Sequence, residues 1–370
     1  MDPRLAGGYV TVDLIAIQQN YRFLSENLKD SECAAVVKAD AYGLGAHKVA
    51  PALAEAGCRK FFVALPEEGI EIRKHLPEIE IFILGGLFDG CEILYIHERL
   101  APVLNSIEEI KIWSNLTEEH GPLPAILHLE TGICRLGLNE KDVRILADNP
   151  AMMDGIEFDY VMSHLASADK PDDLQNKAQL AQFKFLRELL PEGLQQTPVS
   201  FANSSGIFLG NDYLFDLARP GIALFGGNPT PEKENPMQEV VQWQGKILQV
   251  QDVDSEKPVG YGATYRTTGK TRIATVAIGY ADGYFRYLGN KAECSINNKR
   301  VPVVGRVSMD MIAVDVTSIP REECKRGDLV NLIGGGITLD ELANKAETIS
   351  YEILTSLGHR CHRRYLEAGI

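Results

Sequence analysis

The chain has 370 residues, of which 45% are hydrophobic and 24% charged, proportions that are ordinary for a globular protein of one large domain or two. Its formal net charge of −14 argues against nucleic acid or an anionic membrane surface as the main partner. No apolar run is long enough to cross a membrane, the first residues lack a secretory signal pattern, and the 7 cysteines include no Cys-x-x-Cys pair. We therefore expect a reduced, cytoplasmic protein without a metal site.

The predicted elements begin with a strand at residues 9–12 and a helix over residues 13–28, for which Asp13 is a suitable N-cap. Short apolar runs then alternate with longer helical patterns up to about residue 225, which favours a closed (β/α)8 barrel over an open sheet. The candidate barrel strands cover residues 34–38, 61–65, 79–84, 100–104, 125–129, 156–163, 199–203 and 216–218.

The pattern changes after a segment rich in glycine, proline and asparagine at residues 226–239. Runs rich in valine, isoleucine and threonine, separated by turns, predict a mostly antiparallel β domain. These runs cover residues 240–253, 271–278, 293–296, 301–304, 312–316 and 329–332, and a helix is predicted over residues 339–345. The predicted α/β chain therefore has three parts: an N-terminal strand (1–12) that joins the β domain, a barrel (13–230) and the C-terminal β domain (231–370).

Lys38 is the most informative candidate residue because it ends the first predicted barrel strand. Barrel enzymes place their chemistry at the C-terminal ends of their strands. Burial at such a position lowers the pKa of a lysine and favours the neutral amine that forms a Schiff base. A lysine that extends from the strand end to solvent is the alternative interpretation.

Other polar or small residues follow the later strands. Arg135 lies in the loop after the fifth strand and His164 ends the sixth, although an ordinary loop arginine and a core histidine remain alternatives. Small residues at positions 202–206 and 218–222 follow the last two strands, where such barrels bind phosphate through backbone amides. A lysine opposite a phosphate site indicates pyridoxal 5′-phosphate as the cofactor.

At these positions the chain resembles the alanine racemase family, and the resemblance covers most of its length. The segments that carry it are residues 37–45 (VKADAYGLG), 131–137 (TGICRLG), 219–222 (RPGI), 260–265 (GYGATY), 279–283 (GYADG) and 305–310 (GRVSMD). The resemblance implies an isomerase that uses pyridoxal 5′-phosphate to interconvert L-alanine and D-alanine for peptidoglycan synthesis. It also implies a head-to-tail homodimer in which the β domain completes the partner's active site.

The same resemblance implies roles for individual residues. Lys38 would carry the cofactor and be the base on the D-alanine side, and Tyr261, from the other subunit, would be the base on the L-alanine side. His164 and Arg219 would lie beside the cofactor and assist Tyr261, with Arg219 facing the ring nitrogen.

Substrate and phosphate contacts are also implied. Arg135 and the backbone amide of Met309 would hold the substrate carboxylate. The cofactor phosphate would be held by Tyr42, Ser204, Gly221 and Ile222.

Two positions depart from the family pattern. Family members often have a lysine, carbamylated in some, where this chain has His128, so we expect no carbamate and another group must position Arg135. Near the C-terminus, His359 is expected in place of a tyrosine that contacts the phosphate in some members.

Other functions fit parts of the sequence. A related racemase with a wider pocket and a decarboxylase of the same fold are enzyme alternatives, but we find no cysteine-containing tryptophan motif of the kind that the decarboxylase uses. A single-domain barrel protein that only carries the cofactor is the alternative without catalysis, and the β domain with Tyr261 argues against it.

Overall fold

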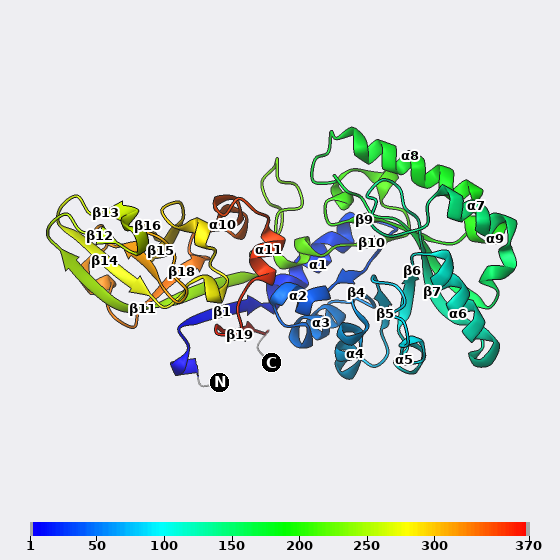
Figure 1. The fold of residues 1–370 in the computed structure, drawn as a ribbon, viewed down its shortest axis with the longest axis horizontal. Coiled ribbons are helices and arrows are strands. Elements are labelled where there is room, and N and C mark those ends of the chain that lie inside the picture. The colour runs from blue at the N-terminus through cyan, green and yellow to red at the C-terminus, as the bar shows by residue number, and fades with distance from the viewer. Residues whose placement is uncertain (1–2, 368–370) are drawn as a thin grey trace.

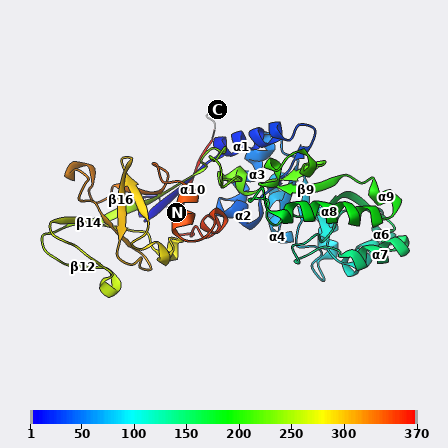
Figure 2. The same cartoon turned by 90° about the horizontal axis from the view of Figure 1, so that it is seen from above.

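The structure is a computed structural model that describes residues 3–367. A barrel and a β domain lie side by side along the long axis of the molecule (Figure 1). The view from above shows the same arrangement, with α2 (Lys38–Gly43) and α10 (Leu339–Lys345) near the junction of the two parts (Figure 2). Among residues 3–367, no helix combines the length and the apolar character needed to span a bilayer.

The barrel consists of parallel strands that follow one another in chain order. Its first strand is split at Ala34 into β2 (Glu32–Cys33) and β3 (Ala35–Val36), followed by β4 (Lys60–Val63), β5 (Glu80–Ile83), β6 (Ala101–Leu104), β7 (Leu123–His128), β8 (Ile156–Met162), β9 (Val199–Asn203) and β10 (Leu217–Arg219). β2 pairs with β10 and β3 pairs with β4, so the sheet closes on itself. This confirms the predicted barrel, and each predicted strand ends within two residues of an observed one.

Helices surround the barrel, and the longer ones have an apolar face that packs against it. In α1 (Leu14–Asn27) the buried side chains include Leu14, Ile17, Tyr21 and Leu24, which share one face, and the carboxylate of the predicted N-cap, Asp13, accepts the amide of Ala16 at 2.9 Å. The remaining barrel helices are α3 (Ala46–Glu55), α4 (Pro66–His75), α5 (Glu92–His97), α6 (Ile107–His120), α7 (Glu140–Asp148), α8 (Leu174–Leu189) and α9 (Glu192–Gln195).

The second sheet belongs to the β domain and is antiparallel except where its last strand joins. Its order is β14 (Thr271–Val276), β17 (Ile312–Asp315), β16 (Lys299–Val304), β15 (Glu293–Ile296), β18 (Leu329–Ile333), β11 (Val241–Val253), β1 (Gly8–Asp13) and β19 (His362–Leu366). The long strand β11 also pairs with β14, so the two ends of its length serve different neighbours. The mostly antiparallel β domain is therefore confirmed, and β1 lies between β11 and β19.

Three features of the structure have no counterpart among the predicted elements. They are β19, α11 (Ser350–Thr355) and a hairpin of β12 (Pro258–Val259) and β13 (Tyr265–Arg266). The sequence of β19 (HRRYL) has little apolar character, and its strand conformation depends on parallel pairing with β1. The limits that we assigned to the three parts of the chain stay a prediction.

Candidate active site

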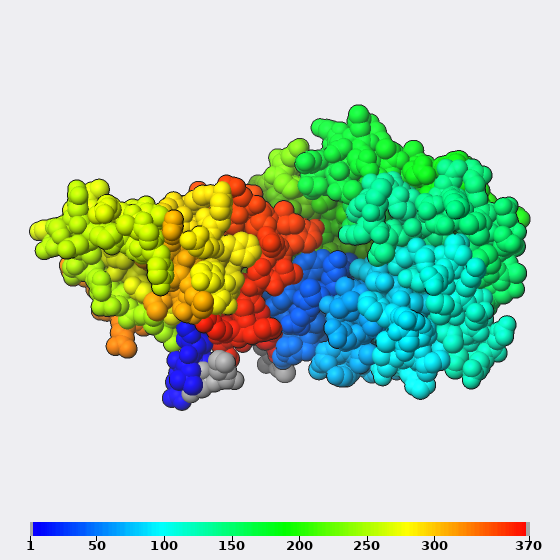
Figure 3. Space-filling view, in the orientation of Figure 1, coloured from blue at the N-terminus to red at the C-terminus, as the bar shows by residue number. Residues whose placement is uncertain are grey.

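A cavity of about 320 Å³ opens at the C-terminal ends of the barrel strands. In the space-filling view, the surface is recessed where the red segment that contains α11 meets the blue and green parts of the barrel (Figure 3). Eight of the ten predicted site residues line this cavity, namely Lys38, Tyr42, Arg135, His164, Ser204, Arg219, Gly221 and Ile222. Strands far apart in sequence meet at this mouth because the barrel is closed.

Lys38 begins an unusual turn at one side of the cavity. Residues 39–42 all have left-handed backbone angles, with φ between 52° and 56°, which costs about 1 kcal/mol or more for each residue that is not glycine. Tertiary contacts hold the turn: the Glu68 carboxylate accepts the amide of Ala39 at 2.6 Å, and the Asp40 carboxylate accepts the amide of Ala46 at 2.7 Å. The backbone that follows Lys38 is thus held in a conformation that the local sequence alone disfavours.

The environment of Lys38 favours its neutral amine. Burial lowers the pKa of Lys38, the positive charge of Arg135 lowers it further, and the charge of Glu68 opposes the shift. Within residues 3–367 its amine takes part in no hydrogen bond or ion pair, so it is available for chemistry at the cavity.

Arg219 is a buried cation at the end of β10. Its guanidinium donates to the carbonyl oxygen of Ser163 at 2.7 Å and to the hydroxyl of Ser200, and it lies over the ring of Phe62. Burial lowers its pKa to about 10, which still leaves it charged at neutral pH. In the described part of the chain, no carboxylate forms an ion pair with it.

A tight corner at Gly221 and Tyr42 forms another part of the cavity wall. The hydroxyl of Ser204 accepts the amides of Gly221 at 2.9 Å and Ala223 at 3.3 Å. A Cβ atom on Gly221 would lie 2.2 Å from the hydroxyl oxygen of Tyr42, so only glycine allows this close approach. Burial raises the pKa of Tyr42, which therefore remains a phenol.

The structure adds a lining residue that the sequence did not reveal. Tyr351, from α11, lines the cavity, and its ring centroid lies 5.8 Å from that of Tyr42. His359, which we expected at the position of a phosphate-binding tyrosine, is not among the lining residues. Because no element is predicted over α11, the sequence does not indicate that Tyr351 lines the cavity.

The loop that carries Arg135 is shaped by one carboxylate. Glu130 accepts the amides of Gly132, Ile133 and Cys134 at 2.7, 2.7 and 2.8 Å. Burial alone would raise the pKa of Glu130, but these three donors outweigh it and the pKa is lowered. Arg135 itself is exposed and, within the described residues, has no hydrogen bond or ion pair.

His164 lies in the field of two arginine side chains, Arg219 and Arg135. Desolvation by the surrounding protein lowers its pKa well below the usual range, and the charges of Arg219 and Arg135 add to the effect. The imidazole is therefore neutral at pH 7.

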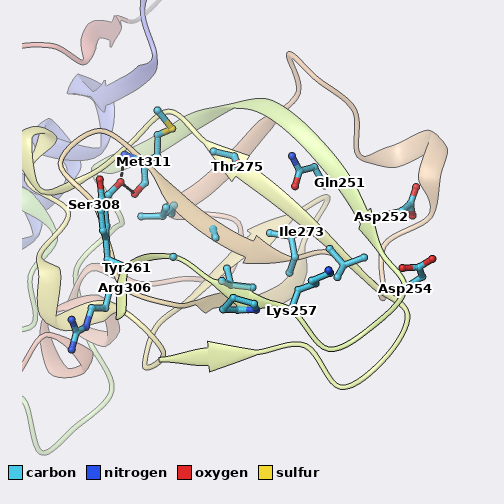
Figure 4. A pocket seen from close by; sticks show the side chains of 16 residues that line it. Gln251, Asp252, Asp254, Lys257, Tyr261, Ile273, Thr275, Arg306, Ser308 and Met311 are labelled. Atoms are coloured by element: carbon cyan, nitrogen blue, oxygen red, sulfur yellow. Dashed lines mark hydrogen bonds between the residues drawn. The ribbon is translucent and has the colours of Figure 1, made fainter. Parts of the chain in front are cut away.

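Tyr261 and Met309 do not line the barrel cavity of their own chain. Tyr261 lines a second cavity of about 770 Å³ in the β domain, where it lies at one end near Arg306, Ser308 and Met311 (Figure 4). Tyr261 is 72% exposed and Met309 is 53% exposed. Within a single chain, the predicted site is thus divided between two surfaces.

Comparison with known proteins covers both parts of the chain. The alanine racemase N-terminal domain model matches residues 12–229, and the C-terminal domain model matches residues 240–365. A catabolic alanine racemase from Agrobacterium fabrum is 46% identical over 99% of this chain and 94% of the relative. An alanine racemase from Rhodospirillum rubrum is 47% identical over 97% of this chain and 96% of the relative.

The fold agrees with these sequence relationships. The crystal structure of alanine racemase from Bartonella henselae, which has covalently bound pyridoxal phosphate, superposes with a TM-score of 0.92 at 42% identity, covering 98% of this chain and 100% of that one. From the family matches and from identities above 40% over nearly the full length, we conclude that the chain belongs to the alanine racemase family.

Proposed function

We propose that the protein is a pyridoxal 5′-phosphate-dependent racemase that interconverts L-alanine and D-alanine. The observation that carries this proposal is the barrel cavity, whose wall contains both a lysine of lowered pKa and the tight corner formed by Gly221 and Tyr42. In a chain of this family, a cavity that combines a free amine with a close backbone approach suits a ligand that has an aldehyde and a phosphate.

The residues of the cavity fit the cofactor. The amine of Lys38 would bond to its aldehyde carbon, and Tyr42, Ser204, Gly221 and Ile222 would hold the phosphate. Arg219, beside His164, would donate to the ring nitrogen. When bound, the cofactor withdraws electrons from the α-carbon of the amino acid, which makes the α-proton removable.

Two bases on opposite faces of the α-carbon are needed for racemisation. Lys38 moves the proton on the D-alanine side, and Tyr261 of a second chain moves it on the L-alanine side. Arg135 and the amide of Met309 hold the substrate carboxylate. Because a guanidinium can only donate hydrogen bonds and its positive charge disfavours a second cation beside it, Arg219 would keep that nitrogen unprotonated.

A head-to-tail homodimer follows from this assignment. Tyr261 is exposed in the β domain, apart from the cavity that contains Lys38, which supports a site completed by a second copy of the chain. Each barrel would then receive Tyr261 and Met309 from the other subunit.

We assign the enzyme to the cytoplasm, as a source of D-alanine for peptidoglycan. Because one relative is named a catabolic alanine racemase, the assignment needs a test in the cell. Deletion of the gene should make growth dependent on added D-alanine. A growth defect that appears only when alanine is the carbon source would instead indicate a catabolic role.

The reaction itself is tested with the purified protein. It should show the visible absorbance of bound cofactor and bring a solution of L-alanine to zero optical rotation. Unchanged rotation would contradict the proposal, and release of carbon dioxide from a basic amino acid would indicate the decarboxylase alternative.

A further inference from the structure

His128 lines the barrel cavity, yet none of the roles above involves it. It is the last residue of β7, and its side chain is only 5% exposed. Its Nε2 atom is buried and finds no hydrogen-bond partner among the residues that the structure describes. Buried polar atoms are nearly always paired, so an unpaired one at the wall of a site points to a partner that arrives from elsewhere.

Asn105 determines which ring nitrogen of His128 carries the proton. The Nδ1 atom of His128 lies 2.7 Å from the Oδ1 atom of Asn105. The amide nitrogen of Asn105 donates to the carbonyl oxygen of Val103 at 2.7 Å, which leaves Oδ1 as the acceptor that faces the imidazole. Nδ1 therefore donates, and Nε2 presents a lone pair to the cavity.

The imidazole stays neutral. Burial lowers the pKa of His128 to about 3, with the charges of Arg219 and Arg135 adding to this effect. A neutral ring with its proton on Nδ1 can only accept at Nε2, and the partner must be a donor.

The loop of Arg135 is built against His128. The amide of Leu138 donates to the carbonyl oxygen of His128 at 2.8 Å, which returns residues 131–137 to the end of β7. A Cβ atom on Gly137 would lie 3.2 Å from Cγ of His128, so the loop packs directly on the ring. Arg135 thus belongs to a short loop whose far end rests on this imidazole.

Two guanidinium groups act on His128 electrostatically, and only one is free to become its donor. Arg219 is already held by Ser163 and Ser200 and makes no hydrogen bond to Nε2 in that position. Arg135, in contrast, is exposed and has no partner within residues 3–367. We propose that Nε2 of His128 accepts a hydrogen bond from the guanidinium of Arg135 and so positions it for the substrate carboxylate.

This inference rests on the proposed function, and it makes His128 a positioning residue that acts through Arg135. Two substitutions test the roles of the two ring nitrogens of His128 separately. In His128→Asn the amide nitrogen replaces Nδ1 and keeps the donor to Asn105, but nothing occupies the position of Nε2. In His128→Gln the side-chain oxygen reaches the position of Nε2 and restores an acceptor there.

The experiment uses the loaded holoenzyme and propionate, which is alanine without the amine and so binds through its carboxylate without reacting. Loss of a hydrogen bond to a charged group should weaken propionate binding in His128→Asn by about tenfold or more. In the same variant, the KM for alanine should rise by a similar factor and kcat should change less. His128→Gln should remain within about threefold of the wild type in propionate affinity and in KM. Circular dichroism and cofactor titration establish that each variant folds and loads.

The possible outcomes separate the role of His128 from the proposed racemase activity. If His128→Asn binds propionate as the wild type does, or if the two variants lose affinity equally, the role of Nε2 is refuted. A further outcome is that the wild type fails to racemise alanine while it and His128→Gln still bind propionate more tightly than His128→Asn does. In that case the proposed function fails, but the positioning of Arg135 stands.

Discussion

Gly221→Ala is expected to weaken cofactor binding sharply because the corner at Tyr42 has no room for a side chain. The new Cβ atom would lie 2.2 Å from the hydroxyl oxygen and 3.0 Å from Cζ of Tyr42. Tyr42 cannot easily move away, since its ring packs against Phe225 at 4.9 Å and Tyr351 at 5.8 Å between centroids. Overpacking of this kind costs about 1–3 kcal/mol.

Because Tyr42 is enclosed on two sides, we take the upper part of that range, about 2–3 kcal/mol. Tyr42 would relieve the clash by leaving the corner in which it is proposed to hold the phosphate, so binding would have to restore the strained arrangement, and this cost corresponds to a loss of roughly 30- to 150-fold in affinity for pyridoxal 5′-phosphate. The assay is a titration of the dialysed protein with the cofactor, followed by absorbance. Gly193→Ala is the matched control, since a Cβ atom there meets nothing within 4 Å.

A double substitution tests the cause of the loss. Tyr42→Phe removes the oxygen that clashes, although it also removes a proposed phosphate contact. If the clash is the reason, Gly221→Ala combined with Tyr42→Phe should lose less affinity than the product of the two single losses, by a coupling of about 1 kcal/mol or more. Strict additivity, or an unimpaired Gly221→Ala protein, would refute the steric explanation.

Three further outcomes are expected. Borohydride reduction of the holoenzyme should attach the cofactor to Lys38, and a peptide map with the adduct on another lysine would contradict that assignment. Mixed dimers of the inactive Lys38→Ala and Tyr261→Phe chains should regain activity through one intact site, and no recovery after subunit exchange verified by mass would argue against shared sites. Asp159 has a pKa raised to about 6, by burial first and then by Glu80. The folded state therefore binds more protons than the unfolded state between about pH 4 and 6, and stability is lost as the pH rises through that window. Asp159→Asn should accordingly be more stable than the wild type at pH 8. Its gain in free energy of unfolding should be larger at pH 8 than at pH 5 by about 1 kcal/mol, after allowance for partial exposure. An equal gain at both pH values would contradict the pKa shift.

The sequence alone was sufficient for the barrel and for most of the β domain. The predicted barrel strands are short apolar runs next to turn residues, and the predicted strands of the β domain are rich in β-branched residues, so local patterns contain the information for these elements but not for β19 (HRRYL). The strand end that carries Lys38 could be recognised for the same reason, since a charged residue directly after an apolar run is a local sequence pattern. The family resemblance then added Tyr261 and Met309, to which no local pattern assigns a role.

Tertiary contacts decided the rest. The left-handed turn at residues 39–42 is unfavourable for its own sequence and exists because Glu68, 29 residues away along the chain, accepts the amide of Ala39. Tyr351 reaches the cavity only because α11 packs beside the turn that contains Tyr42. The free Nε2 of His128 follows from Asn105 on the neighbouring strand end, which directs the proton to Nδ1. Hydrogen bonds and packing between distant segments have no local signature, so these features emerge only when the closed barrel brings the segments together.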